Sequence, residues 1–111
     1  MRILDALSLP GRSVTRFGSE GFTAGTVARG DSLQIGVLRL DAGGCIGRHP
    51  AVKRQILLLL EGDASVSGDF DHPSVELGPG QAATWEPNES HETRSRTGMT
   101  ALVIEGDFEI V

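Results

Sequence analysis

The chain has 111 residues, enough for one domain with a modest hydrophobic core. Ten basic and 15 acidic residues give a formal charge of −5, which argues against a nucleic acid partner because an acidic surface repels phosphates. The N-terminal residues are charged too early for a signal peptide, no apolar run is long enough to cross a bilayer, and a single cysteine cannot form an internal disulfide. We therefore expect a cytoplasmic protein that makes no membrane contact.

The apolar residues form a series of short runs. Glycine accounts for 15 of the 111 residues and separates these runs, as it does in proteins rich in tight turns. No stretch of ten or more residues has the 3.6-residue period of a helix. In chain order the patterns predict strands at 14–17, 22–27, 33–40, 55–60, 64–67, 74–77, 82–85, 91–97, 99–105 and 108–111. The sequence therefore predicts an all-β protein, a single barrel or sandwich domain over residues 1–111.

Two glycine-framed segments each contain a histidine. The first runs from Gly43 through His49 to Gly62, and the second runs from Gly80 to His91. Both segments resemble the two sequence motifs of the cupin superfamily. The resemblance covers roughly residues 30–107 and implies a small β-barrel of jelly-roll topology.

The chain departs from the cupin pattern at four motif positions. In the first motif Ala51 replaces the second histidine and Gln55 replaces the glutamate. In the second motif Glu86 and Asn88 stand where proline and glycine are expected, while His91 is in place. Two of the four usual metal ligands are therefore changed.

The resemblance implies that His49, Gln55 and His91 converge inside the barrel and bind a divalent transition metal, such as Fe, Mn, Ni, Co, Cu or Zn. The amide oxygen of Gln55 can coordinate a metal but adds no charge, so such a site is weaker than one that contains a carboxylate. The alternative is that Gln55 only hydrogen-bonds His49 or a water and that the barrel binds no metal. Ala51 cannot coordinate and opens space at its ligand position.

Four residues are predicted to line a ligand pocket beside the histidines. Ala51 is the first of them. Cys45 shares parity with His49 if that segment is extended, and Thr93 shares strand parity with His91. Trp85 precedes the turn to His91, where it either closes the pocket mouth or packs in the core. His72 stands in a polar turn-rich segment and is predicted to be solvent-exposed.

Two hypotheses on function remain open, and both include a small organic ligand. The first, slightly favoured, is a metal-binding cupin barrel, for example a dioxygenase, isomerase or decarboxylase. The second is a metal-free barrel that binds the ligand without catalysis. The reaction and the substrate are not identified by either.

A homodimer is also expected. Strand alternation directs Leu57 and Leu59 inward with Gln55, so three aliphatic side chains point outward and require cover: Ile56, Leu58 and Leu60. The cover is either the N-terminal segment, which contains Ile3, Leu4, Leu7 and Leu9, or a partner subunit. The cupin resemblance favours the partner.

Overall fold

The computed structural model describes residues 1–69 and 73–111, so the predicted exposure of His72 lies outside the described residues. The described parts contain nine strands and two short 3₁₀ helices, and none of these helices is long or apolar enough to cross a membrane. The helices are η1 (Ala6–Ser8) and η2 (Arg16–Gly18). The strands are β1 (Arg12–Ser13), β2 (Glu20–Arg29), β3 (Leu33–Pro50), β4 (Arg54–Gly62), β5 (Ala64–Ser67), β6 (Val75–Leu77), β7 (Ala82–Trp85), β8 (Ser90–Arg94) and β9 (Met99–Gly106).

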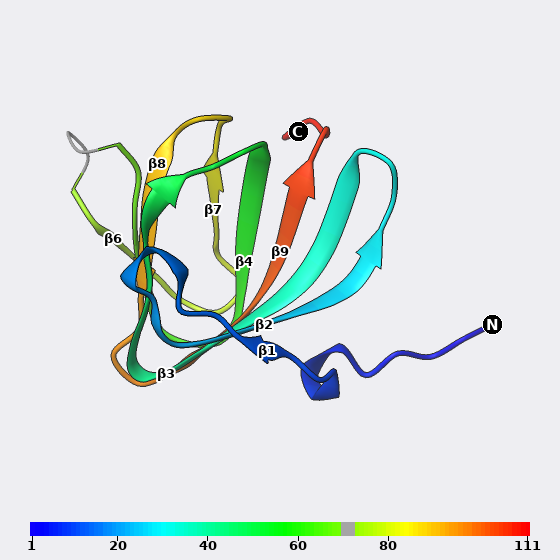
Figure 1. Cartoon of the computed structure of the whole chain (residues 1–111), viewed down its shortest axis with the longest axis horizontal. Helices are drawn as coiled ribbons and strands as arrows, with labels where there is room; N and C mark the ends of the chain where they lie inside the picture. Colours follow the sequence, from blue (N-terminus) through cyan, green and yellow to red (C-terminus); the bar gives the residue numbers. More distant parts are fainter. Residues whose placement is uncertain (70–72) are drawn as a thin grey trace.

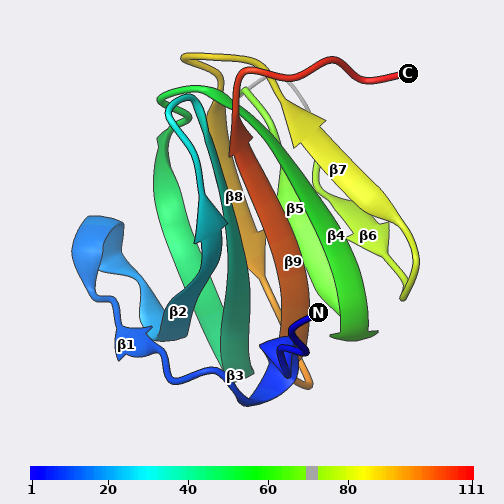
Figure 2. The same cartoon turned by 90° about the vertical axis from the view of Figure 1, so that its right-hand side faces the viewer.

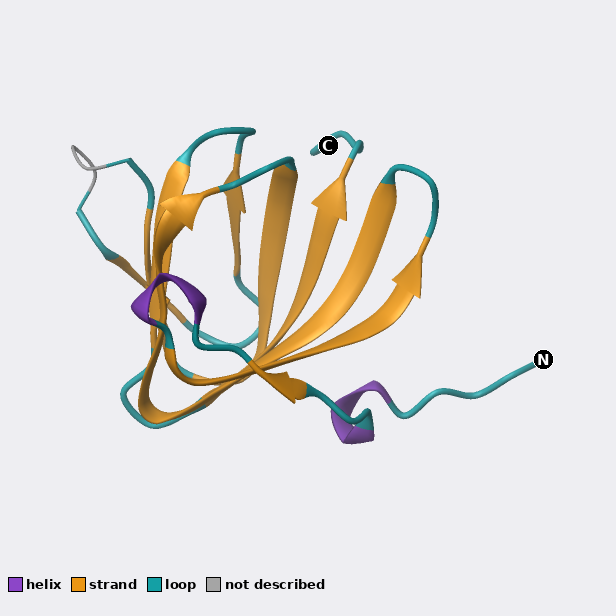
Figure 3. Ribbon diagram, in the orientation of Figure 1, coloured by secondary structure: helices purple, strands orange, loops and turns teal. Residues whose placement is uncertain are grey.

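The strands form one antiparallel sheet that curls around an interior (Figures 1 and 3). Its order is β6-β5-β8-β3-β9-β4-β7, with β2 also paired to β3 and β1 paired to β2. The long strand β3 joins the two walls, because residues 33–40 pair with β9 and residues 45–50 pair with β8. Figure 2 shows β3, β9 and β4 side by side in the wall between β2 and β7. The prediction of an all-β barrel is confirmed.

The bend in β3 occurs at a glycine pair. Gly43 has a φ of +79°, a conformation that side chains on L-residues rarely adopt. A Cβ on Gly44 would lie 2.9 Å from the carbonyl oxygens of Glu20 and Asp41. Only glycine allows the strand to turn here and pass from one wall to the other.

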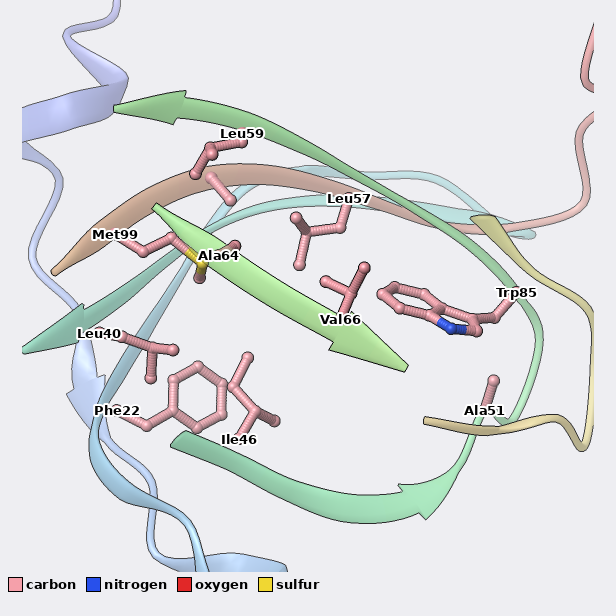
Figure 4. Packing of buried hydrophobic residues seen from close by; sticks show 11 residues of the cluster. Phe22, Leu40, Ile46, Ala51, Leu57, Leu59, Ala64, Val66, Trp85 and Met99 are labelled. Carbon is pink, nitrogen blue, oxygen red and sulfur yellow. The ribbon is translucent and has the colours of Figure 1, made fainter. Parts of the chain in front are cut away.

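The core fills the closed part of the barrel (Figure 4). Each large aliphatic side chain buried there stabilises the fold by about 1.5–3 kcal/mol. The cluster contains Phe22, Leu40, Ile46, Ala51, Leu57, Leu59, Ala64, Val66, Trp85, Met99 and Ala101.

The alternation predicted for β4 is confirmed. Leu57 and Leu59 are 2% and 0% exposed, whereas Leu60 is 36% exposed and Ile56 and Leu58 are only partly buried. The outward side chains of β4 pair in register with those of β9, so the outer face of this wall is aliphatic.

Of the four apolar side chains of the N-terminal segment expected to cover this face, three stay exposed and Leu9 is partly buried. The carbonyl groups of Ala6 and Leu7 accept hydrogen bonds from Arg39 on β3. The side chain of Ile3 is nevertheless 85% exposed, and Leu4 and Leu7 are also exposed. In Figure 1 the chain before η1 runs away from the barrel.

Two predicted strands are wrong. Residues 14–17 lead into the turn η2, where Phe17 has a φ of +60° that no strand allows. Residues 108–111 are not a strand, because the chain leaves the sheet at Gly106, whose φ is +144°. A Cβ on Gly106 would lie 2.1 Å from the carbonyl oxygen of Ser32.

Candidate functional site

The barrel interior contains a cavity of about 760 Å³. Five of the residues singled out in the sequence line it: His49, Gln55, Trp85, His91 and Thr93. The structure therefore brings together residues from β3, β4, β7 and β8 that are far apart in the chain. Their role in binding a metal or a ligand stays a prediction.

Polar and aromatic side chains follow one another along the wall of the cavity. In the register of the sheet, Gln34 of β3 faces Glu105 of β9, Glu105 faces Gln55 of β4, and Gln55 faces Trp85 of β7. The ring then continues through aromatic contacts, because the Trp85 and His91 ring centroids lie 4.6 Å apart. His91 faces His49 across β8 and β3, and Phe17 stacks on the other side of His49. All seven side chains line the cavity, and this set is called the polar ring below.

The two histidines face each other with a ring centroid distance of 4.4 Å and an interplanar angle of 49°. Nδ1 of His49 lies 2.7 Å from the carbonyl oxygen of Gly47. A carbonyl oxygen only accepts, so Nδ1 carries the proton and donates it. Nε2 of His49 is then the nitrogen with the free lone pair.

His91 is the more buried of the pair, with 5% of its surface exposed. Its Nε2 atom is buried and has no hydrogen-bond partner among the described residues. Burial is the largest cause, and the nearby charges of His49 and Arg48 are smaller ones, that together lower the pKa of His91 from 6.5 to about 4. His91 is therefore neutral at pH 7 and presents an imidazole nitrogen to the interior.

Phe17 was not singled out in the sequence, yet it belongs to the polar ring. Its ring stacks on His49 at a centroid distance of 4.4 Å and an interplanar angle of 5°. The turn η2 lies against β3 at Gly47, where a Cβ would be 1.7 Å from the carbonyl oxygen of Phe17. The turn is also held by Ser19, whose Oγ accepts a hydrogen bond from the Gly47 N–H. Gly47 is the residue in the sequence that signals this close approach.

Trp85 both packs in the core and lines the cavity, with 4% of its surface exposed. Its indole N–H donates a hydrogen bond to the carbonyl oxygen of Ser67 at 3.1 Å. Of the two sequence interpretations, core packing describes this residue, because the ring is buried rather than placed over the mouth.

Cys45 does not line the cavity, contrary to the expectation from parity. A register shift lies between Ile46 and His49 on β3, so Ile46 faces Thr93 and His49 faces His91 with one extra residue between them. This bulge reverses the alternation, and Ile46 lines the cavity in place of its neighbour. The Cys45 thiol lies 3.8 Å from the carbonyl oxygen of Gly18 instead.

Ala51 does not line the cavity either. It is completely buried in the core, beside Trp85 in Figure 4. Its N–H donates to the Glu89 carbonyl at 2.9 Å, and its own carbonyl accepts from the Asn88 N–H at 2.7 Å. Asn88 stands where the second cupin motif has glycine, and its φ is +70°. Asparagine tolerates this left-handed conformation better than most residues, so the chain still turns at this position. Core packing takes up the space that a missing histidine leaves.

The side chains in the cavity provide few metal donors. The described residues include no cluster of three or more His, Cys, Asp or Glu side chains suited to a metal ion. The donors that fit are the two imidazoles, with the amide oxygen of Gln55 as a neutral third. His49 also has the hydrogen bond from its second ring nitrogen that is usual for a metal-bound imidazole. The set fits a weak site without a charged ligand.

Sequence reasoning missed Glu105. It stands at the end of a mostly apolar strand and faces the cavity together with Val103. Alternation along 99–105 signals this orientation, because Ala101 and Glu105 share one face of the strand. The register with Gln34 and Gln55, by contrast, depends on strand pairing.

The chain is similar to solved structures over nearly its whole length. A polyketide cyclase, RemF from Streptomyces resistomycificus, superposes with a TM-score of 0.84 at 17% identity, over 96% of this chain and 79% of that one. A predicted oxalate decarboxylase from Thermotoga maritima gives 0.83 at 14% identity, over 96% and 100%. An RmlC-like cupin from Shewanella frigidimarina gives 0.81 at 15% identity, over 98% and 93%.

No protein-family model matches the sequence, and no curated protein matches it. The structural likeness shows that the chain has the cupin fold. Identities of this size show the fold alone.

Proposed function

We propose that this cupin barrel binds a small organic ligand in the cavity bounded by the polar ring. The observation that carries the proposal is the ring itself, seven side chains from five strands and one turn around about 760 Å³ of interior. Ligand sites typically occupy about 300–1,000 Å³ and combine apolar walls with a few polar groups. Leu57, Val103 and Ile46 provide apolar wall here.

The buried Nε2 atom of His91 supports this proposal. A buried nitrogen without a partner costs about 1–3 kcal/mol, and a ligand that hydrogen-bonds it would recover that energy. His49 offers a second free lone pair beside it. The pair would anchor the polar end of a ligand.

A cavity-filling variant tests the proposal. Val103→Phe places a larger side chain in the cavity, and Thr100→Phe on the same strand is the matched control, because it points to the outer face. Compounds from a fragment library that bind the wild type, detected by ligand-observed NMR, should bind Thr100→Phe and fail to bind Val103→Phe. Equal binding by both variants would refute the assignment of the cavity, and so would a library without any binder.

A divalent transition metal in the same cavity is the second candidate. The orphaned Nε2 of His91 and the tautomer of His49 favour it, since both imidazoles present a lone pair. His49, His91 and Gln55 would hold the ion, which would then act as a Lewis acid towards a ligand oxygen. The substitutions at Ala51 and Gln55 weaken this candidate, because Ala51 supplies no ligand and Gln55 supplies no negative charge.

A further inference from the structure

Glu105 differs from the other polar residues of the cavity. Among the described residues that line the cavity it is the one acidic side chain. It is partly buried, and it makes no hydrogen bond or ion pair with the described part of the chain. A carboxylate partly shielded from water and without a partner favours a ligand that supplies one.

Two glutamine side chains beside Glu105 add further hydrogen-bond acceptors to its carboxylate. Gln34 and Gln55 face it from the two adjacent strands, where paired side chains on one face stand about 5 Å apart. Gln34 is already oriented, since its Nε2 donates to Oγ1 of Thr26 at 3.4 Å. One carboxylate between two amides accepts hydrogen bonds from a group with several N–H donors.

Among the described residues, no buried arginine or lysine lines the cavity, where it could compensate a ligand carboxylate. Its basic lining residues are Arg12 and Arg16, both exposed on the segment beside the mouth. The Arg16 guanidinium lies over the Phe17 ring, 4.8 Å from its centroid. Exposed charges such as these are screened by water and salt, whereas the charge of Glu105 is partly shielded from both.

We propose that Glu105 is a specificity-determining residue that selects small organic amines. The ammonium group would lie against Glu105, Gln34 and Gln55, and an apolar or aromatic body would pack on Leu57, Val103 and Trp85. This inference rests on the proposed function, because it assigns a ligand class to the same cavity.

Three probes with one body and different head groups test the proposal: phenethylamine, phenethyl alcohol and phenylacetate. Trp85 is the single tryptophan of the chain and lines the cavity, so its fluorescence reports occupancy, and calorimetry supplies the affinity. A charge-assisted hydrogen bond should make the amine bind about tenfold to a hundredfold more tightly than the alcohol. Phenylacetate should bind more weakly than both.

The variant Glu105→Gln keeps the size of the side chain and removes its charge. It should reduce the ratio of amine to alcohol affinity to about one by weakening amine binding far more than alcohol binding, a pattern that a purely structural role does not produce. Glu61→Gln is the control, because Glu61 lies exposed on β4 in the same wall and does not line the cavity. It should retain the full ratio.

The outcomes separate this inference from the proposed function. If the alcohol binds but the amine has no advantage, or phenylacetate binds best, the role of Glu105 is refuted and the ligand cavity stands. An amine preference that survives in Glu105→Gln also refutes it. If no probe binds up to about 10 mM, the inference fails, and the cavity proposal then depends on the fragment library alone.

Discussion

The stability of the fold should fall as the pH drops from about 7.5 to about 5, with His91 as a main cause. Burial lowers the pKa of His91 to about 4 in the folded state, against 6.5 for a free histidine. Between these values the unfolded chain binds a proton that the folded chain does not. His91 therefore destabilises the fold progressively as the pH falls through this window, and has no such effect above it.

The size of the effect follows from the two pKa values. Each pKa unit corresponds to about 1.4 kcal/mol, so the full loss approaches about 3 kcal/mol below pH 4. At pH 5 the unfolded histidine is almost fully protonated and the folded one is mostly neutral, which gives a loss of about 2 kcal/mol. Asp63 acts in a lower window, because hydrogen bonds from Thr97 and Arg96 lower its pKa from 3.8 to about 2.

Urea unfolding followed by Trp85 fluorescence at both pH values measures this loss, with a chelator present to keep metals off the histidines. His91→Gln should remove about 2 kcal/mol of the pH dependence, whatever its effect on stability at pH 7.5. His49→Gln should reduce it only slightly, because burial is a larger cause of the shift than the charge of His49. If the wild type and His91→Gln lose the same free energy between these pH values, the reasoning is wrong.

Two further predictions concern metal binding and assembly. Gln55→Glu should strengthen the binding of Zn or Mn because it adds a charged donor, and His49→Ala should abolish it; calorimetry that finds both variants equal to the wild type would show that the metal is held elsewhere. The outward aliphatic face of β4 and β9 should be covered by a second copy of the chain, since Ile3, Leu4 and Leu7 remain exposed. Light scattering should therefore give a dimer, Leu58→Asp should release soluble monomer, and Val52→Asp, at an aliphatic residue that is 78% exposed, should stay dimeric. A wild-type mass near 11.7 kDa at micromolar concentration would contradict the dimer.

Local patterns in the sequence were sufficient for most of the fold. Alternation along 55–60 assigned Leu57 and Leu59 to the interior, because a regular strand directs successive side chains to opposite faces. The same rule failed for Cys45, since the bulge before His49 inserts one residue and reverses the faces. A bulge depends on the partner strand β8 and has no clear signature within β3 itself.

Phe17 and Ala51 show a second limit of sequence reasoning. The segment 14–17 before Gly18 was predicted as a strand, but tertiary contact with Gly47 holds Phe17 in a left-handed turn over His49. Ala51 stands at a ligand position of the motif, yet core packing buries it completely. Both outcomes depend on what lies opposite in space.

The sequence by itself determined the strand content, the glycine-dependent turns and the two histidines, because these depend on residue type and on spacing along the chain. Only the tertiary structure decided that Gln34, Glu105, Gln55 and Trp85 form one row and that this row meets His91. Strand register and barrel closure are set by pairing between segments distant in the chain, and a shift of one residue would turn each of these side chains to the other face.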